Sequence, residues 1–285
     1  FWADLENIQY ILVSILIVFF VGVVDDLLVL SPFKKLVGQV LATLILIIIP
    51  DNPIIIDSMH GVLGIQDLPI WISTLFTIFV VIVITNGFNL IDGVDGLAAG
   101  VGVIAASCFG FVSVMIGQND MALIAFTLSG ALIGFLKYNY YPARIFMGDT
   151  GSLLIGLVFS ILAVNIIKHG IVEFNNVDGK NLGPFLAISF LALPLFDSLR
   201  VFLVRVRRGE HPLHPGKDHI HHNLLSLGYD HKKTSFILYF FALIIIFLTY
   251  ILISFNININ YSIALIALIS YLLLYVPVYK LRSKK

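Results

Sequence analysis

The sequence predicts an all-α polytopic membrane protein, with residues 1–285 forming a single domain. The composition is the first reason: of 285 residues, 59% are hydrophobic and 12% are charged, and the mean hydropathy is +1.00. Soluble domains carry about 25% charged residues and disordered chains are poor in apolar residues, so this composition argues against both. The 17 Lys and Arg are balanced by 17 Asp and Glu, which gives no indication of a nucleic-acid partner.

Long apolar runs are the second reason, because a membrane-spanning helix needs roughly 20 apolar residues. Nine segments are candidates: Ile8–Val24, Leu36–Ile49, Ile70–Thr85, Leu97–Gly117, Met121–Leu136, Gly151–Ile167, Pro184–Val204, Ser235–Phe255 and Tyr261–Tyr279. The second segment is short. It spans only if its helix starts near Ser31 and if Lys34 and Lys35 extend to the interface; otherwise it is re-entrant.

The distribution of basic residues is the third reason, and it also predicts the orientation. Of the 17 Lys and Arg, all except Lys168 and Lys180 fall at one set of span ends and connections. Basic residues accumulate on the cytosolic side of membrane proteins. We therefore expect the N-terminus outside, the C-terminus in the cytosol, residues 51–69 as an external loop and residues 205–234 as a cytosolic His-rich loop.

The external loop is expected to contain a small β-hairpin. Its Ile54–Ile56 run is followed by the glycine-containing stretch Gly61–Gly64, which is typical of two short strands joined by a turn.

Most of the acidic residues near the spans fall on the expected cytosolic side. Asp25 and Asp26 end the first span, and Asp197 lies at the inner end of the seventh. The two connections between them carry a polar set: Asn86, Asn89, Asp92, Asp95 and Asp149. Acids at membrane depth are costly and are functional candidates by default. Their convergence on one face predicts one site at the inner interface.

Each acidic motif also has a structural interpretation. Asp25 and Asp26 are compatible with ordinary interfacial polarity, although acids at a helix C-terminus oppose the helix dipole. Asp95 is a candidate N-cap of the fourth span, which accounts for one of the four polar residues in its motif. Asp149 or Thr150 is a candidate N-cap of the sixth span, and the functional alternative is a metal ligand beside a helix N-terminus that attracts phosphate.

The cluster His219, His221 and His222 is open to four interpretations besides phosphate binding: a solvated loop, a zinc site, a pH sensor or an affinity tag, the last of which is unusual in mid-chain. The basic residues Arg205, Arg207, Arg208 and Lys217 lie nearby and suit phosphate, but they are also ordinary topology signals. Asp197 and Arg200 are three residues apart and are expected to pair. His60, His169 and His231 are interpreted as ordinary loop residues.

Four motifs together resemble the polyprenyl-phosphate N-acetylhexosamine-1-phosphate transferases of glycosyltransferase family 4, over essentially the whole chain. The matching stretches are Gly22 to Asp26 with Leu30, Lys35 and Gln39, then Asn86 to Leu97, Phe146 to Ser152, and His219 to His222. The His-x-His-His form resembles the branch that uses UDP-N-acetylglucosamine. The phospho-MurNAc-pentapeptide transferases of peptidoglycan synthesis typically have three consecutive His followed by Glu, whereas Asn223 follows here.

The chain starts with Phe1, and two upstream spans and an Arg/His/Gly-Gly loop shared by family members have no match. We therefore expect an N-terminally incomplete chain.

The resemblance implies transfer of N-acetylhexosamine-1-phosphate, most simply GlcNAc-1-phosphate, from a UDP-sugar to a polyprenyl phosphate such as undecaprenyl phosphate. UMP would be released and cell-envelope polymer synthesis initiated, at the cytosolic face of a bacterial inner membrane, by a monomer or a homo-oligomer. The implied cofactor is Mg²⁺, with Mn²⁺ as an alternative, since Mg²⁺ prefers few carboxylates plus phosphate oxygens.

The resemblance also implies roles for individual residues. The catalytic set is Asp25, Asp26, Asp92, Asp95 and Asp149. Within it, Asp149 is the expected metal ligand with Asp26 or Asp92 nearby, and Asp25 acts either as a base toward the lipid phosphate or in positioning. The expected substrate-binding residues are Asn86 and Asn89 with Asp95 for the nucleotide, Phe146 for stacking on uracil, and Lys35, His219, His221 and His222 for the phosphates.

A membrane transporter is the main alternative, because intramembrane acids also mark ion paths. A transporter should be sensitive to mutation on both membrane faces, whereas an interfacial transferase should be sensitive mainly on the cytosolic face.

Overall fold

A computed structural model of the protein describes residues 7–170, 182–210, 216 and 218–282, and the regular secondary structure of this part of the chain is helical. The helices, with one 3-10 turn labelled η2, are α1 (Ile8–Leu28), α2 (Pro32–Ile48), η2 (Val62–Gly64), α3 (Ile70–Ile91), α4 (Leu97–Met115), α5 (Asn119–Asn139), α6 (Gly148–His169), α7 (Gly183–Phe190), α8 (Ala192–Arg207), α9 (Ile220–Ser226), α10 (His231–Ser254) and α11 (Ile259–Arg282).

The prediction of an all-α polytopic membrane protein is confirmed. Within the described residues, 7 helices are long and apolar enough to cross a membrane, or up to 8 if α7 and α8 together form one bent span. Nine were predicted, and the difference lies at α2 and at the α7–α8 break. Helix α2 does begin beside Ser31, but its 17 residues extend about 26 Å, which is less than the roughly 30 Å hydrocarbon core.

The predicted seventh span, Pro184–Val204, is broken into α7 and α8, which are bent by 77° relative to each other. Pro194 lies in the first turn of α8. Its ring would clash with the carbonyl four residues earlier in a continuous helix, and it has no N–H to donate. The break therefore has a local cause, which the apolar run concealed.

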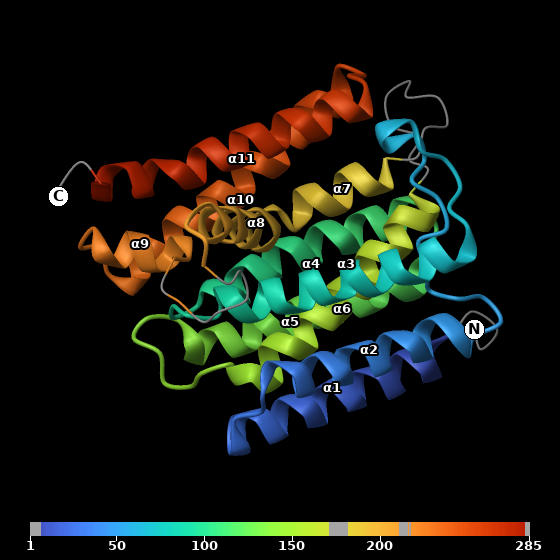
Figure 1. Cartoon of the computed structure of the whole chain (residues 1–285), viewed down its shortest axis with the longest axis horizontal. Helices are drawn as coiled ribbons and strands as arrows, with labels where there is room; N and C mark the ends of the chain where they lie inside the picture. Colours follow the sequence, from blue (N-terminus) through green and yellow to red (C-terminus); the bar gives the residue numbers. More distant parts are fainter. Residues whose placement is uncertain (1–6, 171–181, 211–215, 217, 283–285) are drawn as a thin grey trace.

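Helix α6 forms the centre of the bundle. Figure 1 shows α1 and α2 along one side and α11 along the opposite side, with α3, α4 and α6 between them. The rings of Phe88 and Phe159 stack at 4.6 Å, and Phe109 lies 6.0 Å from Phe159, so α3, α4 and α6 share one aromatic core.

The segment between α2 and α3 reverses direction without forming a β-strand in the part of the chain that is described. One isolated antiparallel bridge joins Ser58 and Asp67, so the predicted hairpin is reduced to a single pair. Ile54–Ile56 packs on the bundle instead, where the backbone N–H of Ile56 donates to Thr77 Oγ1 at 2.9 Å. Asn7 donates to the carbonyl of Asn52 at 3.0 Å, so α1 starts at this same end of the bundle (Figure 1).

Candidate active site

The C-terminal end of α1 lies against the first turn of α6, and Gly22 makes this approach possible. A Cβ atom at Gly22 would lie 2.4 Å from Thr150 Cα, which no real side chain tolerates. One turn later, Asp25 and Asp26 therefore reach the start of α6. Two acids in sequence on α1 thereby meet a third, Asp149, from more than 120 residues away.

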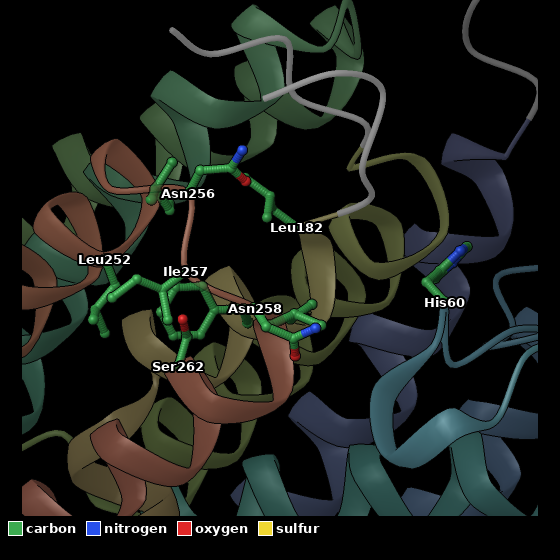
Figure 2. Close-up of a pocket in the computed structure, with 10 residues that line it drawn as sticks. His60, Leu182, Leu252, Asn256, Ile257, Asn258 and Ser262 are labelled. Atoms are coloured by element: carbon green, nitrogen blue, oxygen red, sulfur yellow. The ribbon is translucent and has the colours of Figure 1, made fainter. Parts of the chain in front are cut away.

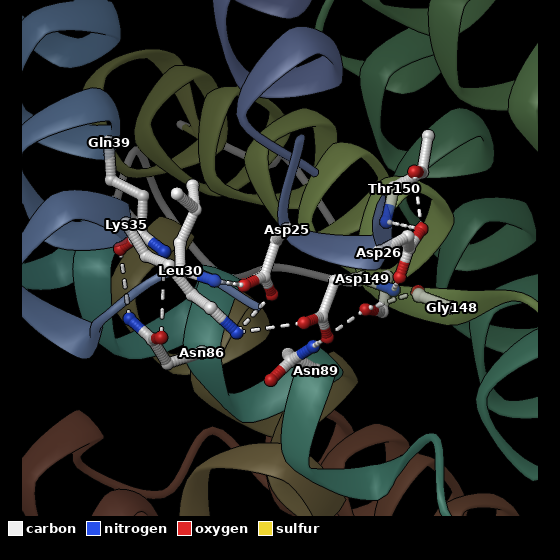
Figure 3. Close-up of polar contacts among 11 residues, drawn as sticks. Asp25, Asp26, Leu30, Lys35, Gln39, Asn86, Asn89, Gly148, Asp149 and Thr150 are labelled. Carbon is white, nitrogen blue, oxygen red and sulfur yellow. Dashed lines mark hydrogen bonds and ion pairs between the residues drawn. The ribbon is translucent and has the colours of Figure 1, made fainter. Parts of the chain in front are cut away.

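Asp26 caps α6 from outside the helix. Its carboxylate accepts the backbone N–H of Asp149 at 2.8 Å and that of Thr150 at 3.0 Å, together with the Thr150 hydroxyl (Figure 3). Neither Asp149 nor Thr150 is the N-cap, so that interpretation is wrong; α6 begins earlier, at Gly148. The anion-binding position at this helix terminus is filled by the protein's own carboxylate.

Lys35, from α2, lies between two carboxylates. Its ammonium forms an ion pair with Asp25 and another with Asp149, the second at 2.7 Å (Figure 3). The other oxygen of Asp25 accepts the backbone N–H of Leu30 at 2.6 Å. The side chain of Asp25 is 2% exposed, whereas those of Lys35 and Asp149 are 24% and 28% exposed. Asp149 and Lys35 are therefore the members that a substrate can reach.

The two asparagines of α3 have different partners. Asn89 donates to the second oxygen of Asp149 and to Ser152 Oγ, the latter at 2.9 Å, so it orients the exposed acid. Asn86 donates to Gln39 at 2.9 Å and to the carbonyl of Ile82 at 2.8 Å, which ties α3 to α2 (Figure 3). Asn89 thus belongs to the acidic cluster, and Asn86 lies one turn away from it.

Asp92 follows the last residue of α3 and adds a fourth carboxyl group. Burial, then the negative charges of Asp149 and Asp26, raise the pKa of Asp92 to about 7. Burial is the main cause of the shift, and the two neighbouring carboxylates add to it. A bound divalent cation would reverse it.

The described residues contain no group of three or more His, Cys, Asp or Glu side chains that could hold a metal ion. Mg²⁺ does not need three, because it is commonly bound by one or two carboxylates together with substrate phosphates and water. Asp149 and Asp92 are the candidates for that mode, since the charge of Asp149 acts on Asp92 and Asp149 is partly exposed.

The histidine motif is brought against the turn after α3. His221 lies so close to Gly93 that a Cβ there would be 2.5 Å from its Nε2 atom. Burial, with the positive charge of His222 next, lowers the pKa of His221 to about 3. His221 is 1% exposed and uncharged at neutral pH, so it packs beneath the turn instead of facing outward. The half-buried His222 ring lies 4.2 Å from it.

The expected cytosolic loop 205–234 is more ordered than predicted. It contains the end of α8, all of α9 and the start of α10, while Lys217 lies outside the described residues. The predicted pair Asp197–Arg200 is confirmed at 2.8 Å, and Asp197 also contacts His219 Nδ1 at 3.0 Å.

Asp218, just before the histidine motif, pairs with two arginines that the sequence left as topology signals. It contacts Arg205 Nε at 3.2 Å and Arg208 Nη1 at 3.0 Å. Burial alone would raise the pKa of Asp218, but the hydrogen bonds from these two arginines hold it below its usual value.

Asp95 and Phe146 are placed outside the acidic cluster. Asp95 accepts the backbone N–H of Ala143 at 3.0 Å and contacts His231 Nδ1 at 2.9 Å. Gly96, not Asp95, occupies the N-cap position of α4, and His231 is a partner and not an ordinary loop residue. Phe146 is 78% exposed. Its predicted stacking role remains a prediction.

The roles of Thr150, Ser152, Asp218 and His231 were not evident from the sequence. Thr150 and Ser152 adjoin Asp149 in the chain, and this proximity could have marked them as part of the site. No local pattern marks Asp218 or His231, because their partners lie in other segments of the chain.

A separate cavity of about 160 Å³ lies at the other end of the bundle (Figure 2). Its described lining includes His60, Phe185 and Ile257 but no Asp or Glu. The acidic cluster is therefore the better candidate for chemistry on phosphates.

Comparison with known proteins gives a consistent set of relatives. A family profile described as "Glycosyl transferase family 4" matches residues 8–167. The chain is 33% identical over 240 residues to a "Decaprenyl-phosphate N-acetylglucosaminephosphotransferase" of Mycolicibacterium smegmatis, covering 80% of this chain and 59% of the relative. It is 34% identical over 174 residues to a "Probable undecaprenyl-phosphate N-acetylglucosaminyl 1-phosphate transferase" of Bacillus subtilis, covering 61% of this chain and 46% of the relative.

A "Phospho-N-acetylmuramoyl-pentapeptide-transferase" of Moorella thermoacetica matches at 43% identity, but over 94 residues that make up only 33% of this chain and 30% of the relative. The chain spans no more than about three-fifths of the length of these relatives.

Proposed function

This chain belongs to glycosyl transferase family 4, and we propose that it transfers GlcNAc-1-phosphate from UDP-GlcNAc to a polyprenyl phosphate and releases UMP. The names of the decaprenyl-phosphate and undecaprenyl-phosphate relatives support the acceptor and the sugar phosphate. The short match to the phospho-MurNAc-pentapeptide enzymes makes that alternative the weaker one. Family membership favours a transferase over a transporter.

The observation that carries the proposal is the meeting of Asp25 and Asp149 across Lys35, with Asn89 and Asp92 beside them. These residues come from α1, α2, α3 and α6, or directly follow them. A UDP-sugar brings a pyrophosphate, and its transfer requires positioning and charge neutralisation more than covalent catalysis. A partly exposed cluster with surplus negative charge suits a substrate that arrives with a divalent cation.

In this proposal Asp149 and Asp92 would hold Mg²⁺, or Mn²⁺, and the ion would supply neutralisation of charge on the donor pyrophosphate. Asn89 orients Asp149 through its hydrogen bond, and Asp26 fixes the backbone that presents Asp149. Lys35 contributes the cluster's ammonium for the phosphates. An oxygen of the lipid phosphate forms a bond to the β-phosphorus, and the bond from that phosphorus to the UMP oxygen breaks.

Asp25 has a positioning role in this scheme. A phosphate monoester loses its second proton near pKa ~6, so the lipid phosphate is already mostly a dianion at neutral pH. A carboxylate base is then not required to activate it. Asp25 instead holds Lys35 and the backbone of Leu30, which joins the ends of α1 and α2.

The proposed location is a bacterial plasma membrane, with the acidic end of the bundle in the cytosol. The seven helices that are long and apolar enough to span, counted within the described ranges, and the asymmetry of Lys and Arg support it. UDP-sugars are made in the cytosol, so a donor site on that face is consistent with the reaction.

The test is transfer of label from UDP-GlcNAc, labelled at the β-phosphate, into lipid by membranes that contain the protein. Polyprenyl phosphate and Mg²⁺ are supplied, and release of UMP is followed in parallel. We expect labelling that stops when Mg²⁺ is chelated and that is lost in Asp149→Asn but kept in Asp51→Asn, a change at an exposed acid of the opposite end. Absence of labelled lipid with the unmodified protein would overturn the proposal.

A further inference from the structure

One acidic side chain of the described residues is completely buried, and hydrogen bonds engage both of its carboxylate oxygens. Asp197, on α8, is 0% exposed. Its Oδ1 atom accepts from Arg200 Nη2 at 2.8 Å and from the backbone N–H of Ile220 at 3.1 Å. Its Oδ2 atom lies 3.0 Å from His219 Nδ1. A buried charge is tolerated only when it is paired and hydrogen-bonded in this way.

The bond to Asp197 determines which ring nitrogen of His219 carries a hydrogen. A carboxylate paired with an arginine is ionised and only accepts, so Nδ1 must be the donor. Nε2 is then the nitrogen of this ring that is left to accept a hydrogen bond, and it has no partner among the residues described by the structure; His219 is 5% exposed. The same geometry fixes the plane of the ring, because Nδ1 and the neighbouring backbone N–H of Ile220 are held by one carboxylate.

The Asp197–Arg200 pair also holds the entry to α9. Arg200 Nη2 donates to the carbonyl of Asp218 at 2.6 Å, and Asp197 accepts the first N–H of α9, from Ile220. The residue between these two contacts is His219, which is the N-cap residue of α9 and adopts an extended backbone. Both flanks of His219 are therefore anchored to α8.

The neighbouring histidines lie close but are held differently. The ring of His221 lies parallel to that of His219, with centroids 5.9 Å apart and planes 9° apart, and it packs under Gly93. Gly93 follows Asp92 in the chain, so His221 links the ring of His219 to the turn that carries one acid of the candidate site. Of the three histidines, His219 is the one whose ring is oriented by a buried acid.

We propose that Asp197 is a positioning residue that acts through His219, fixing the Nδ1–H form so that Nε2 faces the phosphates of the substrate. This inference rests on the function proposed above. Asp197 itself is buried and touches neither the substrate nor the acidic cluster around Asp149. Its effect on turnover should therefore pass entirely through the imidazole.

Asp197→Asn is the first test, because the amide preserves the shape of the side chain. If its oxygen stays toward Arg200 and Ile220, its NH2 group faces His219 Nδ1, and the ring must move its hydrogen to Nε2. The reverse orientation of the amide would place its NH2 group against the N–H donors of Arg200 and Ile220, which is unfavourable. We expect turnover to fall by about 10–100-fold, the loss typical of partners that orient a functional histidine, while Glu210→Gln, at an exposed acid nearby, keeps full activity.

The combination with His219→Ala separates positioning from general support of the fold. If Asp197 acts through His219, adding Asp197→Asn to His219→Ala changes turnover by less than about twofold, because coupled sites are not additive. If the turnover of the double variant fell by the product of the two single losses, the proposal would be overturned.

¹⁵N-histidine NMR gives a readout that does not need activity. The His219 resonance is identified by its absence in His219→Ala. It should show the hydrogen on Nδ1 in the unmodified protein and on Nε2 in Asp197→Asn.

A second pair of variants keeps the proposal testable if Asp197→Asn does not fold. At position 219, an Asn amide lies near the place of Nδ1, and a Gln amide reaches the place of Nε2. We expect His219→Gln to keep at least about tenfold more activity than His219→Asn, as a lost hydrogen bond to a charged group is worth about 1.5–3 kcal/mol. Equal activities would contradict the proposal. Lack of transfer by the unmodified protein would instead refute the proposed function, and the NMR result would still decide the role of Asp197.

Discussion

Two polar clusters lie close together in this bundle, and they are neutralised in opposite ways. Around Asp149 lie the carboxyl groups of Asp25, Asp26 and Asp92, and the ammonium of Lys35 forms ion pairs with Asp25 and Asp149. Around Asp197, the balance is reversed, since Asp197 and Asp218 face Arg200, Arg205 and Arg208. The first cluster has an excess of negative charge and the second does not.

The two clusters also differ in access to solvent. The side chains of Lys35 and Asp149 are 24% and 28% exposed. In the second cluster the central pair Arg200–Asp197 is 3% and 0% exposed, whereas Asp218 and Arg208 at its edge are 25% and 45% exposed. Surplus charge that can be reached from solvent attracts a cation and a phosphate, and the balanced, buried pair at the centre of the second cluster fixes geometry. The difference indicates a reacting cluster supported by a rigid one.

The largest effect is expected from Asp149→Asn. This change removes the partly exposed carboxylate that pairs with Lys35 while keeping the shape of the side chain, and it leaves the Asp197 cluster untouched. Turnover should fall by about 10³-fold, as for a principal electrostatic group of an active site, and extra Mg²⁺ should not restore it. Labelled-lipid assays at several Mg²⁺ concentrations measure this. Activity within tenfold of the unmodified protein would show that Asp149 is not the ligand.

Lys35→Met should have the next largest effect, about 10²-fold on turnover, because it removes the ammonium between Asp25 and Asp149. It also leaves two carboxylates facing each other without a cation, so Mg²⁺ should raise the Tm of this variant more than that of the unmodified protein. Thermal unfolding with and without Mg²⁺ tests this. An equal Mg²⁺ effect in both proteins would mean that the lysine does not occupy the place of a cation.

Gly93→Ala tests whether the two clusters are connected through the turn after α3. The new Cβ would lie 2.5 Å from His221 Nε2, so the ring or the turn must move. We expect about a tenfold loss of turnover, comparable to other small displacements around an active site. Gly130→Ala is the matched control, since a Cβ there meets nothing within 4 Å. If both variants kept full activity, the contact would have no functional consequence.

The smallest effect is expected from Thr150→Val, which removes one of the donors to Asp26. The cap would keep its two backbone hydrogen bonds, so the free energy of unfolding should decrease by about 1 kcal/mol. Asp26→Ala removes the whole cap and should cost about 0.5–2 kcal/mol, with Thr150→Ser as the neutral control. A larger loss of activity than of stability in Asp26→Ala would indicate that Asp26 does more than cap α6.

The sequence by itself determined which segments are spans and which residues gather at one end. The spans were predictable because their length and apolar character are local properties, and α1, α3 to α6, α10 and α11 all follow the predicted runs. The gathering of Asp25, Asp149 and Asn89 was predictable because every second connection of a polytopic chain returns to the same side. The sequence shows Pro194 but does not predict the bend before it, because membrane-spanning helices often accommodate proline with the help of neighbouring helices.

Only the tertiary structure decided which partner each polar side chain takes. Asp26 caps α6 because Gly22 allows two helices to approach, and no pattern within α1 or α6 specifies that distance. The contacts of Asp95 with His231 and of Asp197 with His219 also depend on packing, since each joins segments that are separated in the chain. A hydrogen bond is lost within a few tenths of an ångström, so the roles of these residues depend on helix packing, which hydropathy and spacing do not encode.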